Sequence, residues 1–272
     1  MIRKVLIALI SVIFLVVAVY VSNLLIGSAA AQTEETKAAD GGIDRYVDNY
    51  AFGVGEKLRF DIGYGFINAG YAIMEVADLV EYNGRPCYQV VSSAFSNKFF
   101  SSFFRVEDRV ESIIDAVGIF SWHFEKHLQE GSYRSDRICE FDQVNHSVIY
   151  QDSTYEVAPY VQDALSIMYF ARTQELKVGE TIYMNNFTDG KNYPLAVKVH
   201  RRETIKVKAG KFRCLVVEPF LKTSGIFKHE GKLTVWLTDD RLKLPVLMKS
   251  KVLVGSISAE LTEYDLGEIV EF

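Results

Sequence analysis

Hydrophobic and polar residues alternate along most of the chain from Lys57 onwards. In the first such stretch, Leu58, Phe60, Ile62, Tyr64 and Phe66 alternate with charged residues and glycine, the two-residue period of a β-strand with one buried face. The period returns near residues 72–76, 104–110, 120–124, 233–237, 246–254 and 257–261. Many short strands separated by turns predict a mainly β protein with a curled antiparallel sheet, either a half-barrel or barrel-like.

One segment, residues 161–172, breaks this period. Its sequence VQDALSIMYFAR places Leu165, Met168 and Arg172 on one helical face, and Asp163 is a suitable N-cap. The segment is apolar nearly all round, which is typical of a buried helix. We therefore expect the sheet to wrap around one central helix.

Two local sequences predict how the strands are connected. Residues 208–211 (KAGK) lie between two apolar runs, which indicates a hairpin. The tripeptide Val-Gly-Glu occurs at residues 54–56, before the first strand, and again at residues 178–180, after the helix. This recurrence is compatible with two β halves joined by the helix, each entered by a similar turn.

The first 31 residues have the three parts of a secretory signal peptide. Arg3 and Lys4 precede a long apolar run, and the segment ends on residues 29–31, Ala-Ala-Ala. We expect cleavage and a periplasmic protein; the alternative is an uncleaved segment that anchors the chain to the inner membrane. Residues 32–50 lack periodicity and predict a flexible linker, which leaves residues 51–272 as the β domain.

Charge and cysteine content narrow the class of protein. The chain has 272 residues, with 30 Lys and Arg against 35 Asp and Glu and a net charge of −5. This acidic balance without basic runs excludes a phosphate-driven nucleic-acid binder. Cys87, Cys139 and Cys214 make an odd number, and their apolar or strand-like surroundings favour buried thiols over a disulfide framework.

Short motifs follow one another along the chain: GEKL at 55–58, Gly70, DALS at 163–166 up to Arg172, VGE at 178–180, AGKF at 209–212, WLTDD at 236–240 and LPV at 244–246. Their order resembles the bacterial envelope family known as domain of unknown function 3108. The resemblance covers about residues 51–265 and implies an exported, mostly β protein with a curled sheet, without assigning any catalytic residue. By looser analogy, such a fold is similar to periplasmic half-barrels that shield acyl chains.

A candidate metal site lies in the strand near residue 125. His123, Glu125 and His127 would project from one strand face at ~7 Å intervals, and two imidazoles with a carboxylate are ligands that suit Zn²⁺. We favour the alternative that Trp122 and Phe124 face the core while these three residues form the solvent-exposed face of the strand. A metal-dependent hydrolase is therefore the third of our functional hypotheses.

Aromatic residues supply the candidate ligand site. The run at residues 99–104, FFSSFF, would present rings on both faces of a strand, so some of them must meet the helix, a ligand, a membrane or another protein. We expect a non-catalytic protein that binds or handles a hydrophobic, lipid-like envelope component; the main alternative is a scaffold or assembly factor for a protein partner. The sequence lacks a Gly-x-Ser-x-Gly elbow and a P-loop and implies no cofactor. The predicted ligand-binding residues are Phe99, Phe100, Phe103, Phe104, Leu165, Met168 and Tyr169.

Overall fold

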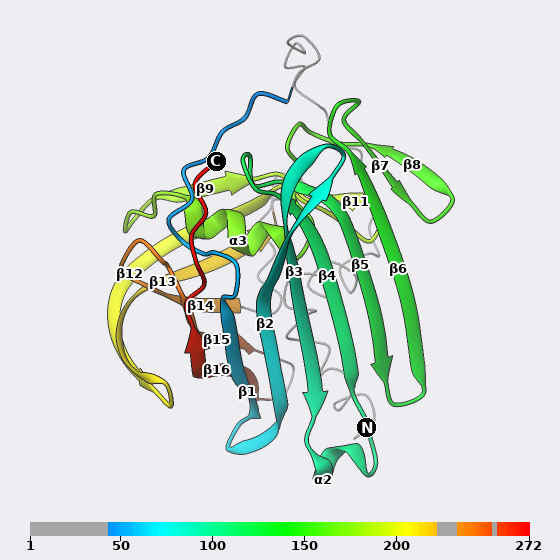
Figure 1. Ribbon diagram of the computed structural model, residues 1–272. Helices are drawn as coiled ribbons and strands as arrows, with labels where there is room; N and C mark the ends of the chain where they lie inside the picture. Colours follow the sequence, from blue (N-terminus) through cyan, green and yellow to red (C-terminus); the bar gives the residue numbers. More distant parts are fainter. Residues whose placement is uncertain (1–42, 222–232, 252–254) are drawn as a thin grey trace.

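Antiparallel strands make up most of the computed structural model, which describes residues 43–221, 233–251 and 255–272 (Figure 1). The first half of the described chain is a run of strands interrupted by the short helix α2 (Lys98–Ser101). These strands are β1 (Lys57–Tyr64), β2 (Ile67–Tyr82), β3 (Arg85–Ser96), β4 (Glu107–Asp115), β5 (Ser121–Glu130), β6 (Tyr133–Asp142), β7 (Ser147–Tyr150) and β8 (Ser153–Glu156).

The second half begins with helix α3 (Ser166–Thr173) and continues as strands to the end of the chain. The predicted hairpin at residues 208–211 is confirmed, because Val207 pairs with Gly210 across the β12–β13 turn. The strands are β9 (Thr181–Met184), β10 (Phe187–Thr188), β11 (Lys191–Asn192), β12 (Leu195–Val207), β13 (Gly210–Leu221), β14 (Leu233–Thr238), β15 (Pro245–Lys251) and β16 (Ser256–Asp265).

Fourteen strands form one sheet in the order β8-β7-β6-β5-β4-β3-β2-β1-β16-β15-β14-β13-β12-β9, and β10 and β11 pair separately. The described strand pairs are antiparallel, and β1 joins the two halves by pairing with both β2 and β16. The predicted mainly β, antiparallel architecture is therefore confirmed. The sheet is not a closed barrel, because β8 and β9 are its two ends and do not pair with each other.

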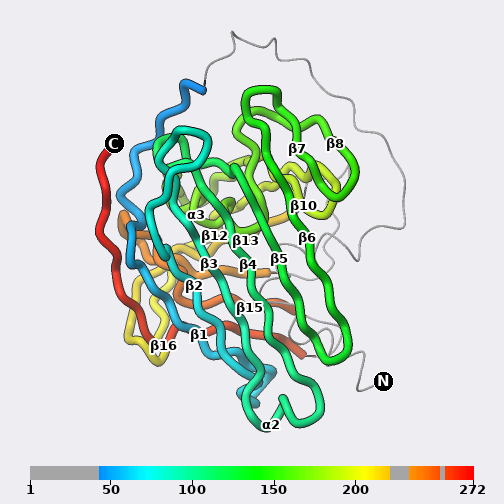
Figure 2. The backbone as a smooth tube through the Cα atoms, turned by 45° about the vertical axis from the view of Figure 1, so that its right-hand side comes forward, coloured from blue at the N-terminus to red at the C-terminus, as the bar shows by residue number. Residues whose placement is uncertain are grey.

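The sheet curls so that its two halves face each other. Strands β1–β6 form one wall and β12–β16 lie behind it (Figure 2). Register shifts in β1, β2 and β4 mark irregular pairings, which raise the local twist of a strand. Alternate residues such as Leu58, Phe60 and Ile62 of β1 and Val246 of β15 are buried in one core between the walls.

Helix α3 is shorter than predicted. The prediction spans residues 161–172, but the helix begins at Ser166 because Gln162 pairs with Asn186 in a parallel bridge, which keeps the chain extended. The prediction of one central helix needs a second correction: the described chain has α2 as well, and α3 lies towards the end of the sheet opposite α2 (Figures 1 and 2). α3 packs between two parts of the core, because Tyr169 lies in one apolar cluster and Ile167 in another.

The segment before β1 is docked on the body from residue 43. The predicted linker spans residues 32–50, but Arg45 donates to the Ile119 carbonyl at 2.9 Å and Val47 N to the Val117 carbonyl at 2.9 Å. These bonds attach Arg45 and Val47 to the segment at residues 117–119. The predicted signal peptide lies outside the described residues. Within the described residues, no helix is long and apolar enough to cross a membrane.

The three cysteines are free thiols, and all are buried. The preference for buried thiols over a disulfide framework is thus confirmed. Burial raises the pKa of Cys87 to about 12 and the pKa of Cys214 to about 11. Such groups remain protonated near neutral pH and pack as small apolar side chains.

Candidate functional site: an aromatic tip and its groove

Large apolar side chains are exposed together at the end of the sheet that carries α2. We call Phe66, Ile67, Phe99 and Phe103 the aromatic tip. Phe66 is fully exposed, and the exposed fractions of Phe99 and Phe103 are 70% and 56%. Phe66 lies in the β1–β2 turn and Ile67 at the start of β2, and the other two lie on the β3–β4 connection. This turn and this connection lie side by side in both views (Figures 1 and 2).

Hydrogen bonds hold these two connections together. Asn97 caps α2 by accepting from Phe100 N at 3.0 Å, and its Nδ2 donates to the Asn68 carbonyl at 2.7 Å. Asn97 N also donates to the Ala69 carbonyl at 3.0 Å. The tip is therefore presented by the fold and does not depend on a free loop.

Buried phenylalanines anchor the exposed ones. Phe100 and Phe104 are nearly inaccessible and belong to the main core. The ring centroids of Phe99 and Phe103 lie 5.4 Å apart, and Phe99 is also 5.4 Å from Phe100 in an edge-to-face contact. Two of the four phenylalanines in this connection thus serve packing, and two are free to meet another surface.

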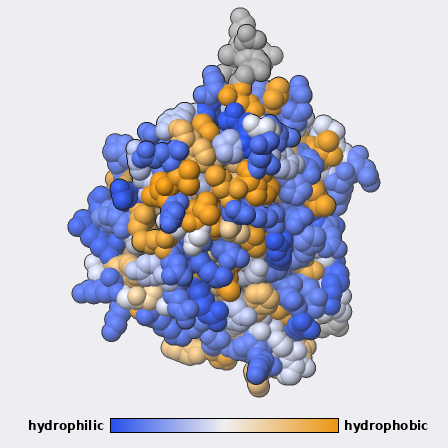
Figure 3. Space-filling view, viewed as in Figure 1, coloured by the Kyte–Doolittle hydropathy of each residue, from blue (hydrophilic) through white to orange (hydrophobic). Residues whose placement is uncertain are grey.

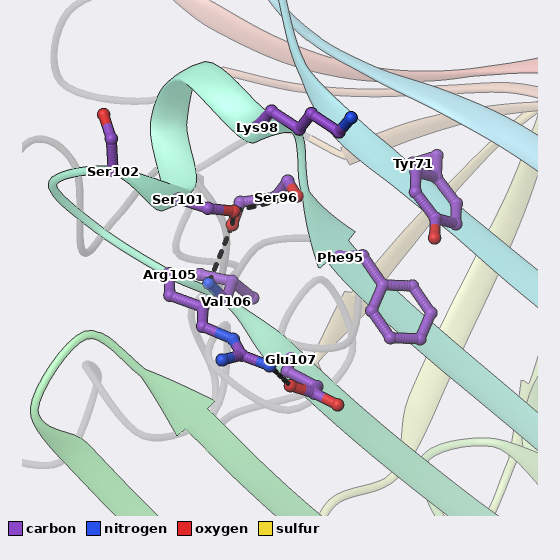
Figure 4. Close-up of a pocket in the computed structure, with 9 residues that line it drawn as sticks. All are labelled: Tyr71, Phe95, Ser96, Lys98, Ser101, Ser102, Arg105, Val106 and Glu107. Carbon is purple, nitrogen blue, oxygen red and sulfur yellow. Dashed lines mark hydrogen bonds and ion pairs between the residues drawn. The ribbon is translucent and has the colours of Figure 1, made fainter.

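An open groove of about 530 Å³ lies beside α2 (Figure 4). Tyr71 and Phe95 stack at 5.1 Å on one side of it, and Arg59 lies 4.2 Å over the Tyr71 ring. Polar groups occupy the other side in Figure 4, where the hydroxyls of Ser96 and Ser101 are 2.7 Å apart. The lining residues are Tyr71, Phe95, Ser96, Lys98, Ser101, Ser102, Arg105, Val106 and Glu107.

The structure separates the seven predicted ligand-binding residues into two groups. Phe99, Phe100, Phe103 and Phe104 lie at the α2 end, whereas Leu165, Met168 and Tyr169 lie in or beside α3 towards the other end (Figures 1 and 2). The contiguous core connects the groups through its buried members. The α3 group packs in the interior of the curled sheet, whereas only Phe99 and Phe103 of the α2 group reach the surface.

A buried ion pair fixes the α3 group. Arg172 donates to both oxygens of Glu56, at 2.7 and 2.6 Å, and to the Ala51 carbonyl at 2.7 Å. Its guanidinium also lies 5.4 Å from the centroid of the Tyr169 ring. Burial raises the pKa of Tyr169. Sequence analysis placed Arg172 on the helix but did not identify its partner 116 residues away.

Asp163 lies in the turn before α3 and is buried. Its carboxylate accepts from Leu165 N at 2.6 Å and from Ser166 N at 2.7 Å, so it binds the first amides of the helix as an N-cap does. It also accepts from the hydroxyls of Ser112 and Ser121 on the sheet. Despite these four bonds, burial raises the pKa of Asp163.

A polar row on the inner face of the sheet escaped the sequence analysis. Asp108 is buried on β4; one oxygen accepts from Gln129 N at 2.9 Å, and the other finds no hydrogen-bond partner within the described ranges. Burial raises the pKa of Asp108 to about 7. Lys126, also buried, binds Asp189 at 2.9 Å. Both residues are in phase with apolar core positions such as Val110 and Phe124, a signal that was available in the sequence.

The three predicted metal ligands share one face of β5. Glu125 lies 3.8 Å from Nε2 of His123 and 3.6 Å from Nε2 of His127, and each Nδ1 pairs with a further carboxylate, Glu140 or Asp136. The hydrogen bond to Glu140 raises the pKa of His123. The two histidines are four positions apart on the strand, a spacing of ~13 Å along the backbone. In the described part of the chain, no group of three or more His, Cys, Asp or Glu, these three included, is placed to hold a metal ion. The zinc site remains a prediction.

Comparisons with known proteins concern the fold and the family. The chain has a TM-score of 0.53 and 11% identity to a beta-barrel-like protein of the domain of unknown function DUF1849 from Brucella abortus, covering 80% of this chain and 100% of that one. A candidate lipoprotein from Parabacteroides distasonis has a TM-score of 0.36 and 9% identity, with 82% and 100% covered. No curated protein matches the chain. The model of the family described as protein of unknown function DUF3108 matches residues 59–262, and the chain belongs to this family.

Proposed function

We propose that this protein is an exported, non-catalytic binding protein for a lipid-like component of the bacterial envelope, and that the groove beside α2 receives the ligand. The observation that carries the proposal is the composition of the groove. A stacked aromatic pair, Tyr71 and Phe95, faces hydroxyl and cationic groups across about 530 Å³. This volume is within the range of small-molecule sites.

The two sides of the groove match the two parts of an amphiphile. The Tyr71 and Phe95 rings and Val106 offer apolar contact to a hydrocarbon chain. Lys98 and Arg105 are exposed at the groove, where they offer charge-assisted bonds to an anionic headgroup. Arg105 is already paired with Glu107 at 2.5 Å, so Lys98 is the stronger candidate for that role.

The N-terminal sequence supports an envelope location. A basic start, an apolar run and three alanines are the parts of an export signal. After cleavage we expect the folded domain in the periplasm. This placement brings the groove into the compartment where lipid-like envelope components are handled.

Native mass spectrometry tests the proposal. Protein purified from a bacterial envelope should carry an acyl-bearing adduct at about one per chain, and solvent extraction should release it. The Ser101→Trp variant fills the groove and should lose the adduct. Thr154→Trp, on exposed strand β8, is the matched control and should retain it. A wild-type protein without any adduct would count against the proposal.

A second candidate function, a scaffold that binds a protein partner, rests on the edge of β6. On β6, strand β7 pairs only with the last four residues, Cys139–Asp142. In the described residues, Tyr133–Ile138 of β6 are therefore paired on the β5 side alone. Such an edge can accept a strand from another protein. The Asp136→Pro variant should abolish binding of a partner by this edge and leave ligand in the groove.

A further inference from the structure

We infer that the aromatic tip is a docking surface for a lipid bilayer that contains anionic headgroups. This inference goes beyond the binding of a single ligand in the groove and rests on other observations. They are the exposure of the tip, its rigid support, and the charges around it.

The tip exposes apolar side chains where the strand pattern would bury them. In β1, alternation buries Leu58, Phe60 and Ile62, and the same phase continues to Phe66. Phe66 instead lies in the β1–β2 turn and is fully exposed. Phe99 and Phe103 are exposed beside it on the neighbouring connection. Seen from the side used in Figure 1, apolar surface reaches the lower end of the molecule (Figure 3).

A third turn completes this end of the sheet. Gly131 N in the β5–β6 turn donates to the Arg105 carbonyl at 2.7 Å, and a Cβ added to Gly131 would lie 2.7 Å from the Phe104 ring. The turn therefore packs directly against the connection that carries α2. Tyr133, half exposed, extends the apolar surface.

The charge of these three turns is uniformly positive. Residues 65–68, 97–106 and 131–134 contain Lys98, Arg105 and Arg134 but no Asp or Glu. The whole chain, by contrast, has a net charge of −5. All three cations are exposed. Glu107, which pairs with Arg105, begins β4 just beyond the connection.

Aromatic rings flanked by cations fit the interface of an anionic membrane. Phenylalanine rings enter the boundary between headgroups and acyl chains, and basic side chains remain at the level of the phosphates. The turns project from one end of the sheet (Figures 1 and 2), so the molecule would stand end-on with strands β2–β6 pointing at the bilayer. The groove beside α2 would then open next to the membrane surface.

Quenching of tryptophan fluorescence by brominated lipid tests whether the aromatic tip itself enters the bilayer. The result does not depend on whether another part of the chain also binds the membrane. Phe99→Trp places a fluorophore in the tip, and Tyr183→Trp places one at an exposed position on β9. Each is measured against the wild type, whose Trp122 and Trp236 are buried. The probes are vesicles of brominated phosphatidylcholine with and without 30% phosphatidylglycerol.

We expect strong quenching of Phe99→Trp on the anionic vesicles and none of Tyr183→Trp. Adding Lys98→Gln or Arg134→Gln should weaken partitioning about fivefold each, and high salt should act in the same direction. Equal quenching at both positions, or quenching that ignores phosphatidylglycerol and salt, would overturn the inference. So would no quenching, the result expected if the tip binds a protein.

The groove variant separates this inference from the proposed function. Ser101→Trp, introduced with Phe99→Trp, should lose the acyl adduct and still show anionic-vesicle quenching of position 99, after subtraction of the Ser101→Trp signal. Retained adduct without quenching would refute docking and leave the groove proposal standing. If Phe99→Trp is quenched but the wild-type protein carries no adduct, the groove proposal would be refuted and docking would stand.

Discussion

The two ends of the curled sheet place polar and apolar groups in opposite ways. At the α3 end, Glu56, Arg172 and Asp163 are almost completely buried. At the α2 end, Phe66 and Phe99 are among the most exposed large apolar side chains of the described residues. Burying charge costs free energy unless each polar atom is bonded. Exposed apolar groups contribute little to folding, so their presence at the tip calls for a partner outside the chain.

At the buried end, hydrogen bonds stabilise the charged groups of Glu56, Arg172 and Asp163. Arg172 uses three of its nitrogens on Glu56 and on the carbonyls of Ala51 and Leu242. Asp163 receives four bonds from two amides and two hydroxyls. These groups bind α3 to the start of β1 and to strands β4 and β5. The α3 end is therefore where substitutions should cost the most stability.

Arg172→Met should produce the largest loss of stability. It leaves the Glu56 carboxylate buried without its partner, and such changes cost about 3–5 kcal/mol. Urea denaturation monitored by fluorescence measures the loss. Lys57→Met, which breaks the exposed pair with Glu75, is the control and should cost less than about 1 kcal/mol. Adding Glu56→Leu to Arg172→Met should restore part of the stability; no restoration would contradict the charge argument.

Asp163→Ala should cost about 3 kcal/mol, because it leaves two amides and two hydroxyls without their acceptor in the interior. Asp142 is a matched control: its carboxylate accepts from Val144 N and Asn145 N in an exposed turn. Asp142→Ala should cost less than about 1 kcal/mol. The same denaturation series compares them, and equal losses would show that burial is not the deciding factor.

The sequence predicted the strands of this fold better than the roles of its polar residues. The Val-Gly-Glu turns at 54–56 and 178–180 show why. Gly55 N binds the Val76 carbonyl at 2.8 Å, and Gly179 N binds the Val199 carbonyl at 2.8 Å, so the local backbone is alike. Both glycines have positive φ, which favours glycine. Glu56 is buried against Arg172, whereas Glu180 is exposed.

Local sequence thus determines the turn, and the partner 116 residues away determines the role of the glutamate. The candidate site shows the same limit. The aromatic run at residues 99–104 was recognisable, but which rings are exposed depends on the Asn97 cap and on the neighbouring β1–β2 turn. Phe66 was assigned to a buried strand face because its phase is correct; the strand ends at Tyr64. The alternation of apolar and polar residues predicts which face of the sheet a residue occupies only for residues within the strand.

Asp108 is an intermediate case, a buried carboxyl group with one oxygen lacking a partner in the described residues. Its pKa is raised from 3.8 to about 7, so the folded state binds the proton more tightly than the unfolded chain does. Stability should therefore fall as pH rises from about 4 to 7, and the penalty should persist above pH 7. Asp108→Asn removes this penalty and should stabilise the protein by about 2 kcal/mol at pH 8.

Denaturation series at pH 5 and pH 8 test this sign. At pH 5 the carboxyl group is still protonated in the folded state while the unfolded chain is largely ionised, so only part of the penalty has developed and the advantage of the variant should be smaller than at pH 8. Asp152→Asn, at an exposed position in the turn between β7 and β8, provides the control for a lost surface charge. A variant that is less stable than the wild type at pH 8 would mean that the Asp108 carboxylate has a partner that favours its charged form.

The smallest effect on stability should come from the tip, and it distinguishes a surface made for contact from one made for packing. Phe99 and Phe100 are adjacent and touch edge-to-face at 5.4 Å, yet Phe99 is 70% exposed and Phe100 only 8%. Phe100→Ala should cost about 3 kcal/mol, whereas Phe99→Ala should change stability by less than about 0.5 kcal/mol. Thermal unfolding in detergent-free buffer compares them. If Phe99→Ala were as costly as Phe100→Ala, the tip would be part of the core. If it is neutral, as its exposure predicts, folding gives no reason for a phenylalanine there, and the reason must lie in what the tip touches.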